Sequence, residues 1–194
     1  MSVLRRIPKS LTFLFWMTIL TGVLYPAAVT LVAQLAFPKA ANGSLLVVDG
    51  AVRGSELLAQ KLESPRFFRA RPSASDYAYI GAGASNLGPV SADLAKAVAG
   101  RREAWARDFG TSAPEDMLCA SASGLDPDIS LEAALAQVGR VSTARGLGAD
   151  VRSGLVASIR KRAEEATGLL GTPRVDALSL DAMLETDPAY KPSR

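Results

Sequence analysis

One stretch of the chain carries no charged residue over 29 positions, from Ser10 to Pro38, whereas polar and apolar residues mix throughout the remainder. Crossing a bilayer takes roughly 20 mostly apolar residues, so this stretch predicts a transmembrane helix over residues 11–37, after a short N-terminus at residues 1–10. A secretory signal peptide has a shorter apolar core of ~7–15 residues and ends at a small-x-small cleavage site. The sequence Pro38-Lys39-Ala40 is a poor cleavage site, so an uncleaved membrane span is favoured.

The charges that flank the span predict its orientation. Arg5, Arg6 and Lys9 precede it, while only Lys39 follows closely. Cytoplasmic flanks of membrane spans hold the excess of lysine and arginine. We therefore expect a single-pass protein of the cell inner membrane with a cytoplasmic N-terminus and a periplasmic domain at residues 40–187.

The middle of the span contains residues that a plain anchor does not need. Pro26 frees backbone carbonyls that a neighbouring helix must help to satisfy, and it directly follows the amphipathic Tyr25. Gly22 and the pair Ala27-Ala28 offer a small surface for the approach of another helix. Two interpretations remain open: an anchor that happens to contain proline, or a helix that packs within a larger membrane complex through Gly22, Tyr25 and Pro26.

Downstream of the span, the hydrophobic pattern switches between the periods of strands and helices, which predicts a single mixed α/β domain and an α+β fold class for the chain. Residues 64–90 hold three prolines and three glycines, so we expect a long irregular loop there, and such loops are often functional. In order, the expected elements are a strand at Leu45–Val48 closed by Asp49-Gly50, a short helix at residues 56–62 capped by Ser55, a helix between Ser91 and Gly110 with Leu94, Val98, Trp105 and Phe109 on one face, a helix capped by Ser130, a helix carrying Val151, Leu155 and Ile159, a strand at residues 173–178, a short helix at residues 180–184 and a loose tail at residues 188–194.

Charge and composition exclude one class of partner. The chain has 22 basic and 19 acidic residues and a pI near 9.2. Four of the basic residues flank the span, and the remaining 18 stand against all 19 acidic residues in the predicted domain. The domain is therefore close to neutral, which removes the main support for nucleic-acid binding. Cys119 is the only cysteine, so no internal disulfide forms, and we expect it to be a small buried apolar residue.

The sequence assigns no catalytic, cofactor-binding or metal-binding residue. It contains no histidine, which removes Ser-His-Asp and Cys-His nucleophile systems and most zinc sites, and it has no phosphate-binding Gly-x4-Gly-Lys-Ser/Thr loop. Ser158 and Lys161 match a Ser-x-x-Lys motif without its companion motifs, so we expect them to belong to an ordinary charged helix. Asp126, Asp128 and Ser130 begin like a calcium loop but lack its glycine and its last glutamate, so we expect a turn before a helix cap.

Three polar segments, residues 65–74, 85–89 and 120–130, have a less generic composition. They are either structural turns of the fold or surfaces that contact a partner, and both interpretations stay open. The candidate residues are Arg71, Pro72 and Ser73 in the first segment, Asn86, Gly88 and Pro89 in the second, and Gly124, Leu125, Asp126, Pro127, Ser130, Gln137, Arg140 and Arg145 in and after the third.

Together with the span, these segments resemble the C subunit family of the Kdp-type potassium-transporting ATPases. The resemblance covers about residues 12–185 and depends on the order and spacing of many short motifs. Two positions depart from the family pattern: Ala70 stands where the family usually has glycine, and Asp128 replaces a usual histidine. The matching motifs are Thr21-Gly22, Tyr25-Pro26, Phe37-Pro38, Gly43-Ser44, Gly54-Ser55-Glu56-Leu57, Arg71-Pro72-Ser73-Ala74, Ser85-Asn86-Leu87-Gly88-Pro89, Ser123-Gly124-Leu125-Asp126-Pro127, Ile129-Ser130, Gln137, Arg140-Val141, Ala144-Arg145 and Pro173-Arg174-Val175.

The resemblance implies a non-catalytic subunit of a four-subunit inner-membrane pump that uses ATP and takes up potassium. The implied partners are a P-type ATPase subunit, a channel-like potassium-binding subunit, a small single-span subunit and the lipid bilayer. The family's C subunit is described as needed for assembly and as a catalytic chaperone that raises the ATP affinity of the ATPase subunit through a ternary complex. Consistent with this division of labour, the chain has neither an Asp-Lys-Thr-Gly phosphorylation motif nor a Thr-Val-Gly-Tyr-Gly filter.

The charge asymmetry of the span and the implied contact with ATP disagree. A domain outside the membrane does not reach cytoplasmic ATP, so we expect the domain to lie over the outer mouth of the channel-like subunit and any effect on ATP to pass through the membrane helices. The alternative is a membrane-anchored periplasmic binding protein or enzyme, unrelated to transport, that uses the loop at residues 64–90.

Overall fold

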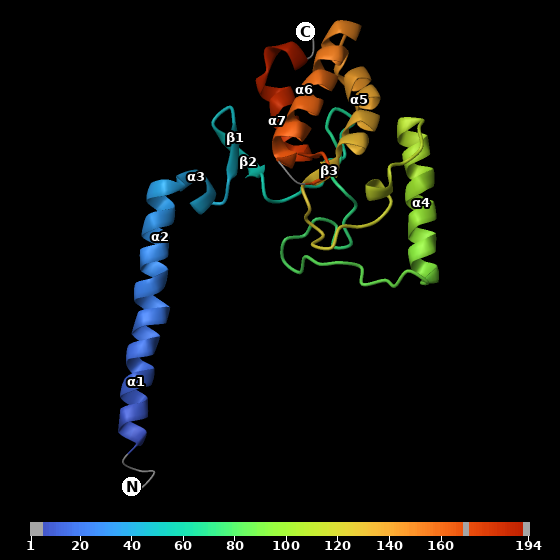
Figure 1. The fold of residues 1–194 in the computed structure, drawn as a ribbon. Helices are drawn as coiled ribbons and strands as arrows, with labels where there is room; N and C mark the ends of the chain where they lie inside the picture. Colours follow the sequence, from blue (N-terminus) through green and yellow to red (C-terminus); the bar gives the residue numbers. More distant parts are fainter. Residues whose placement is uncertain (1–5, 169–170, 192–194) are drawn as a thin grey trace. The chain divides into compact units, whose positions relative to one another are not determined.

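The computed structural model describes residues 6–168 and 171–191, and the chain folds as two separate units that divide near residue 45. We refer to residues 1–45 as the N-terminal unit and to residues 46–194 as the C-terminal unit, and describe each on its own. The order of their elements is drawn in Figure 1.

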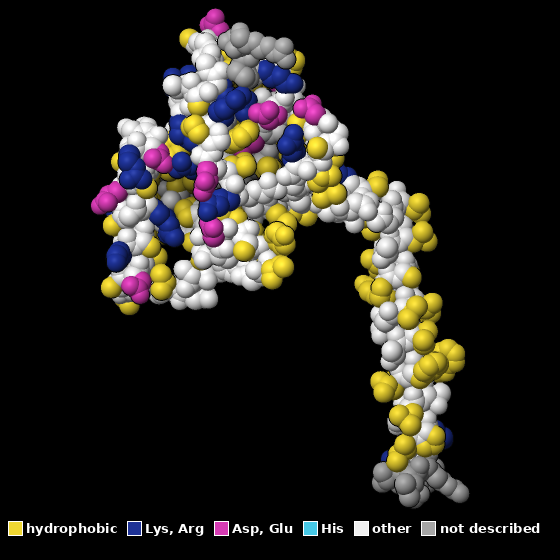
Figure 2. All heavy atoms as spheres, turned by 180° about the vertical axis from the view of Figure 1, so that it is seen from behind, with side chains coloured by type: hydrophobic (Ala, Val, Ile, Leu, Met, Phe, Trp, Pro, Cys, Tyr) yellow, Lys and Arg dark blue, Asp and Glu magenta, His cyan; other side chains and the backbone are white. Residues whose placement is uncertain are grey.

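The N-terminal unit is one long apolar helix followed by a short helical turn. Helix α1 (Ile7–Ile19), a π-helical turn (Leu20–Leu24) and helix α2 (Tyr25–Ala36) run on without a break. Together they form a 30-residue helix, long and apolar enough to cross a membrane, in which no residue of the most apolar window is buried. The visible face of this helix is dominated by hydrophobic side chains (Figure 2). The apolar helix lies where the sequence predicts a span, and it begins four residues earlier than the predicted residue 11.

Pro26 accounts for the π-helical turn in the middle of the span. Proline lacks a backbone N–H and its ring clashes with the carbonyl four residues earlier, which here belongs to Gly22. The turn Leu20–Leu24 lies directly before the proline, and single π turns of this kind relieve such a break. The hydroxyl of Thr21 donates to the carbonyl of Met17 at 2.7 Å, so this polar group is satisfied within the helix, as a lipid environment demands.

A hairpin and a long irregular segment open the C-terminal unit. Strands β1 (Leu45–Val48) and β2 (Ala51–Ser55) pair as a two-stranded sheet, and both residues of the connecting loop, Asp49 and Gly50, have positive φ, as a two-residue Asp-Gly hairpin loop requires. The predicted helix at residues 56–62 is wrong. The hydroxyl of Ser55 does accept from the N–H of Leu57, but it closes only a local turn.

The four helices predicted after Ser91 and the last strand follow in the predicted order, together with a short strand and two 3-10 turns that were not predicted. The residues between 56 and 91 are irregular, as predicted for residues 64–90 but not for residues 56–62. They are followed by α4 (Ala92–Phe109), a 3-10 turn (Glu115–Met117), β3 (Asp128–Ser130), α5 (Leu131–Arg145), α6 (Ala149–Thr167), β4 (Arg174–Asp176), α7 (Ala177–Thr186) and a last 3-10 turn (Pro188–Tyr190).

The core of the C-terminal unit lies where α5, α6 and α7 meet the two-stranded sheet β3–β4. The strands are antiparallel with Ile129 opposite Val175, and both side chains point into the core. Ser130 caps α5 as predicted, because its hydroxyl accepts from the N–H of Ala133 at 3.0 Å. The largest fully buried side chains are Phe68, Ile129, Leu155, Ile159, Leu180, Leu184, Gln137 and Val141.

Helix α4 joins this core only through its second half. Trp105 and Phe109 pack against the core and stack on each other with ring centroids 3.9 Å apart. Leu94 and Val98, predicted on the same face, are only half-buried and lie outside the core cluster. The first half of α4 therefore leaves its apolar side chains partly exposed.

Two further expectations are wrong. Cys119 is exposed rather than buried, because it follows the turn at Glu115–Met117 whose Met117 and the adjacent Leu118 point inward instead. The tail after residue 188 is not loose at Tyr190, whose side chain is 6% exposed and whose hydroxyl lies 3.2 Å from that of Ser158. Residues 192–194 lie outside the described part of the chain.

Candidate functional site

The buried polar residues of the C-terminal unit converge on one irregular segment, residues 64–72, which we call the strap. The strap forms no regular strand, so its backbone groups need other partners when they are buried. Gln137 of α5 supplies two of them: its amide oxygen accepts from the N–H of Arg69 at 2.7 Å, and its amide nitrogen donates to the carbonyl of Arg69 at 3.0 Å. Gln137 is fully buried, so this side chain replaces the neighbouring strand that the strap lacks.

Two arginines of α5 bind the same segment further along. Arg140 donates to the carbonyl of Phe67 at 2.6 Å, and its guanidinium lies 4.7 Å from the ring centre of Phe109. Burial and the nearby charge of Arg69 lower the pKa of Arg140 to about 10, so it remains a cation at neutral pH. The face of an aromatic ring favours a cation in this position.

Arg145 ties three segments together from inside the core. Its guanidinium donates to the carbonyls of Arg66, Leu184 and Tyr190 and forms an ion pair of 2.7 Å with Glu185. The side chain of Arg145 is fully buried. A buried guanidinium needs its hydrogen bonds and its counter-charge satisfied, and here the strap, α7 and the last 3-10 turn provide them.

Asp181 of α7 completes the set that holds the strap. One carboxyl oxygen accepts from the N–H of Phe68 at 2.7 Å, while the other is buried without a hydrogen-bond partner among the described residues. Burial raises the pKa of Asp181 well above its usual range, although the Phe68 N–H and the charge of Arg145 oppose the shift. No local sequence pattern marks Asp181 as a site residue.

The C-terminal end of the strap is fixed to the turn that precedes β3. Arg71 forms an ion pair of 2.9 Å with Asp126, and the carbonyl of Pro72 accepts from the N–H of Ser121 at 2.9 Å. Just beyond the strap, the hydroxyl of Ser73 accepts from the N–H of Tyr77. The first and third polar segments singled out in the sequence are therefore brought together in space.

Gly124 shows how closely these two segments approach. Its φ is +73°, and a Cβ added there would lie 2.7 Å from the hydroxyl of Ser75 and 2.8 Å from the carbonyl of Gly83. The neighbouring carbonyls also accept hydrogen bonds: the carbonyl of Leu125 accepts from the N–H of Ala59, and the carbonyl of Pro127 accepts from the N–H of Ala177. These motif positions hold loops in place rather than facing solvent.

The second polar segment behaves differently, because it is exposed. Asn86, Gly88 and Pro89 are all exposed, and a Cβ added to Gly88 would meet no atom within 4 Å. Asn86 adopts a positive φ of 54°, which asparagine tolerates better than most residues. The structure does not bring this segment together with the other motif residues.

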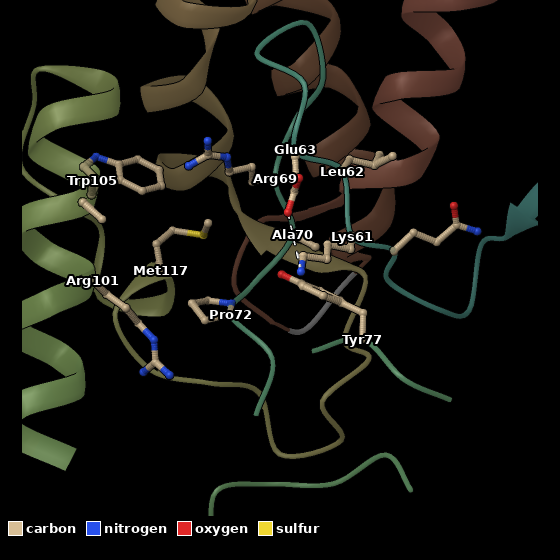
Figure 3. Close-up of a pocket in the computed structure, with 12 residues that line it drawn as sticks. Lys61, Leu62, Glu63, Arg69, Ala70, Pro72, Tyr77, Arg101, Trp105 and Met117 are labelled. Atoms are coloured by element: carbon tan, nitrogen blue, oxygen red, sulfur yellow. Dashed lines mark ion pairs between the residues drawn. The ribbon is translucent and has the colours of Figure 1, made fainter. Parts of the chain in front are cut away.

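A cavity of about 420 Å³ lies between α4 and residues 60–77. Figure 3 shows Trp105 and Met117 on one side of it and Lys61 and Tyr77 on the other. Arg101 of α4 and Ala70 of the strap also line it. Ala70, one of the two departures from the family pattern, is buried in this wall.

Asp128, the other departure, sits on the two-stranded sheet opposite Asp176. It forms an ion pair of 2.8 Å with Arg174. Asp176 caps α7 by accepting from the N–H of Ser179 at 2.7 Å. Burial is the main cause that raises the pKa of Asp176 to about 6, and the charge of Asp128 adds to it.

The described residues contain no group of three or more His, Cys, Asp or Glu side chains that could hold a metal ion. The buried polar side chains bind backbone groups of their own chain, and one long apolar helix precedes the folded unit. Fold and site thus define a class: a protein with one candidate membrane-spanning helix and a mixed α/β unit held together by a polar core.

Comparison with known proteins specifies this class further. Residues 7–186 match the family described as the c chain of the K+-transporting ATPase. The chain is 43% identical over 175 residues to the potassium-transporting ATPase KdpC subunit of Burkholderia ambifaria, covering 87% of this chain and 90% of the relative. It is 45% identical over 186 residues to the KdpC subunit of Methylococcus capsulatus, covering 92% and 95%, and 42% identical over 189 residues to that of Geobacter sulfurreducens, covering 94% and 98%. The chain belongs to the KdpC family and is a component of a potassium-transporting ATPase complex.

Sequence reasoning selected many of the residues that organise this site but missed their partners. Asp181, Glu185 and Asp108 complete the polar core, and each pairs with a residue distant in sequence. Asp108 lies 2.6 Å from Arg69, which keeps the pKa of Asp108 low. No local motif marks such residues, because their roles arise only when helices α4 and α7 pack beside the strap.

Proposed function

We propose that this chain is a non-catalytic accessory subunit that joins the membrane-embedded subunits of a potassium pump and stabilises their assembly. Its C-terminal unit lies in the periplasm over the outer mouth of the channel-like subunit. Its N-terminal helix packs beside the helices of the other subunits in the inner membrane. The membership of the KdpC family supports participation in the complex, and the exposed apolar segment at residues 77–92 carries the proposal of a docking surface.

Residues 77–92, which we call the docking segment, contain no charged residue. Four of their apolar side chains point into solvent: Tyr79 is 77% exposed, Ile80 86%, Leu87 38% and Val90 97%. Leu94 and Val98 of α4, the next large apolar residues along the chain, are half-buried. Exposed apolar patches mark interaction sites on soluble units, and the second polar segment, residues 85–89, lies entirely within the docking segment.

The contacts of the polar core divide the motif residues into two groups. Gln137, Arg140 and Arg145 are engaged with backbone groups of the strap, so they hold the fold. The Nε of Arg140 has no hydrogen-bond partner among the described residues, but it is buried and not presented at the surface. Asn86, Gly88 and Pro89 make no such contact and are exposed. We therefore assign the partner contact to the docking segment and assign stabilisation of the fold to the other motif residues.

The experiment that tests this function changes the docking segment in the intact complex. The double substitution Ile80→Asp/Val90→Asp places two charges where the docking surface is most exposed, and it leaves the core untouched. We expect the variant to fold normally but to lose co-purification with the channel-like and ATPase subunits. Val52→Asp on β2, 61% exposed in the free chain, is the matched control. Normal assembly and transport by the double variant would refute the docking surface.

The span is tested separately, because it makes a different contact. Substituting Pro26 by leucine restores a backbone N–H in the middle of the helix and removes the cause of the π-helical turn. We expect weaker co-purification with the partner subunits and an unchanged melting temperature of the C-terminal unit. Packing through Gly22, Tyr25 and Pro26 is wrong if the variant assembles as well as the unchanged chain.

Orientation and the effect on ATP need their own measurements. A reporter fused after Arg194 should be active only outside the inner membrane. We propose that any rise in the ATP affinity of the ATPase subunit passes through the membrane helices, so the purified chain alone should show no ATP binding in equilibrium dialysis. A cytoplasmic reporter signal, or ATP bound by the isolated chain, would overturn the indirect route.

A further inference from the structure

The cavity beside α4 has the features of a binding groove. Its floor is apolar and is formed by Ala70, Pro72, Trp105 and Met117. Three of these side chains, those of Ala70, Trp105 and Met117, are at most 7% exposed, so the floor is rigid and belongs to the core. A cavity of about 420 Å³ is large enough for several side chains and falls in the size range of binding pockets.

Most charges around the groove are already paired. Lys61 lies 3.5 Å from Glu63 and 2.9 Å from Asp76. On the opposite side, Arg69 forms its ion pair with Asp108. These pairs leave the walls close to neutral.

Arg101 is the exception. Its guanidinium donates to the carbonyl of Leu118 at 2.8 Å, and it forms no ion pair with a carboxylate among the described residues. The groove thus retains one positive charge without a counter-charge. A carboxylate is the group that a guanidinium with free donors pairs with best.

One wall of the groove also offers backbone groups. The stretch from Lys61 to Glu63 is irregular, and the backbone N–H groups of Lys61, Leu62 and Glu63 have no hydrogen-bond partner within the described residues. Unpaired backbone N–H groups can donate to the carbonyls of an added segment.

We propose that this groove binds an extended segment of a partner subunit, which places an apolar side chain on the Trp105–Met117 floor and a carboxylate against Arg101. The inference depends on the proposed function, because it assumes that the chain is assembled with other subunits. The docking segment adjoins the groove: Tyr77, the first residue of the segment, lines the groove, and α4, which carries Arg101, begins at its last residue, Ala92. The docking segment supplies the broad apolar contact, and the groove supplies the contact that depends on charge.

The test uses variants of the full chain in the assembled complex. Arg101→Glu reverses the unpaired charge, and Arg101→Lys keeps it. Ala104→Phe adds an aromatic ring to the α4 wall of the groove, where Ala104 is half-buried. We expect Arg101→Glu and Ala104→Phe to weaken the binding of this chain to the remaining subunits by about tenfold or more, and Arg101→Lys to have a much smaller effect.

The melting temperature of each free variant shows whether the fold is intact. If the melting temperature of Arg101→Glu falls because the hydrogen bond to Leu118 is lost, the binding affinity of Ala104→Phe shows whether the groove contacts a partner. A photo-crosslinker in place of Lys61 should attach to a partner segment that contains an acidic residue beside an apolar one, whereas the same crosslinker at the exposed Arg160 of α6 should not attach to that segment.

Normal affinity of both Arg101→Glu and Ala104→Phe would overturn the groove as a partner site, as would a crosslink from Lys61 that stays within this chain. These failures are distinguishable from failure of the proposed function. The Ile80→Asp/Val90→Asp variant reports on the docking segment alone and contains no change in the groove.

Discussion

Replacing Gln137 by leucine tests the claim that buried side chains stand in for a missing strand. The substitution keeps the size of the side chain approximately and removes both hydrogen bonds to the backbone of Arg69, of 2.7 and 3.0 Å. Gln137 is fully buried, so water does not take over the two bonds without a rearrangement of the strap. The N–H and the carbonyl of Arg69 are therefore left without partners.

Each buried backbone group that loses its partner costs about 1–3 kcal/mol. Two such groups give a loss of about 2–5 kcal/mol in the free energy of unfolding, with some recovery because leucine is more easily buried than an amide. Domains are typically stable by only about 5–15 kcal/mol, so this is a large fraction. With roughly 2–4 °C per kcal/mol for a unit of this size, we expect the melting temperature to fall by about 5–15 °C.

The measurement follows Trp105 fluorescence during thermal unfolding of the full chain in detergent. The chain has two tryptophans, and a Trp16→Phe background leaves Trp105 as the only reporter. Hydrogen exchange of the Arg69 amide should accelerate in the Gln137→Leu variant. Gln60→Leu is the chemical control, because Gln60 is half-exposed and donates one bond, to the carbonyl of Arg53; its loss should cost no more than about 1 kcal/mol. Equal stability of the Gln137 variant and the unchanged chain, with equal protection of the Arg69 amide, would show that the two hydrogen bonds of Gln137 do not hold the strap.

Further predictions concern charge, packing and backbone conformation. Asp176→Asn preserves the helix cap, since asparagine caps as well as aspartate, and removes a carboxylate whose pKa is raised to about 6 when folded and lies near 4 when unfolded. A raised carboxyl pKa favours the folded state below pH ~4, and this contribution to stability is lost as the pH rises through ~6. Above pH 6, the Asp176→Asn variant should therefore be more stable than the unchanged chain by about 1–2 kcal/mol, a figure discounted for solvent screening. Below pH 4 the two chains should be equally stable, and melting temperatures measured across this pH range test both statements. Arg145→Met leaves three backbone carbonyls and a carboxylate without their donor, so urea unfolding should show a loss of about 3–5 kcal/mol in the free energy of unfolding. A loss below 1 kcal/mol would contradict the role of Arg145 in holding the strap, α7 and the last 3-10 turn together. Gly124→Ala should lower the melting temperature measurably, because the backbone at Gly124 has a φ of +73° and a Cβ there would meet atoms of Ser75 and Gly83. Gly88→Ala is the control and should leave the melting temperature unchanged, because a Cβ there would meet no atom within 4 Å. Identical melting temperatures of the two variants count against a tight approach at Gly124.

Local patterns predicted most of the regular structure. The helix that follows Ser91 begins and ends where its signals indicate, because the hydroxyl of Ser91 accepts from the N–H of Leu94 and Gly110 adopts a left-handed conformation. Likewise, Leu155 and Ile159 of α6 are fully buried, as their spacing predicts. The predicted helix at residues 56–62 failed because local capping by Ser55 is weak beside tertiary contacts, such as the bond from the N–H of Ala59 to the carbonyl of Leu125.

The sequence singled out the candidate residues as motif positions but did not reveal their arrangement in space. Arg71 and Asp126 are 55 residues apart in sequence and form one ion pair. Motif membership alone did not distinguish this pair from Asn86 and Pro89, which are exposed. Burial separates the two groups, and burial depends on which segments pack against each other.

Four features follow from the amino-acid sequence alone, because each depends on composition or on neighbours within a few turns of chain: the apolar span, its flanking charges, the order of the helices after Ser91 and the family resemblance. The contacts of the strap with Gln137, Arg140, Arg145 and Asp181, and the exposure of the docking segment, arise only in the folded chain. This is because a buried polar group must find its partner wherever the fold brings one. That partner can be a backbone carbonyl 79 residues away, as for Arg145 and Arg66.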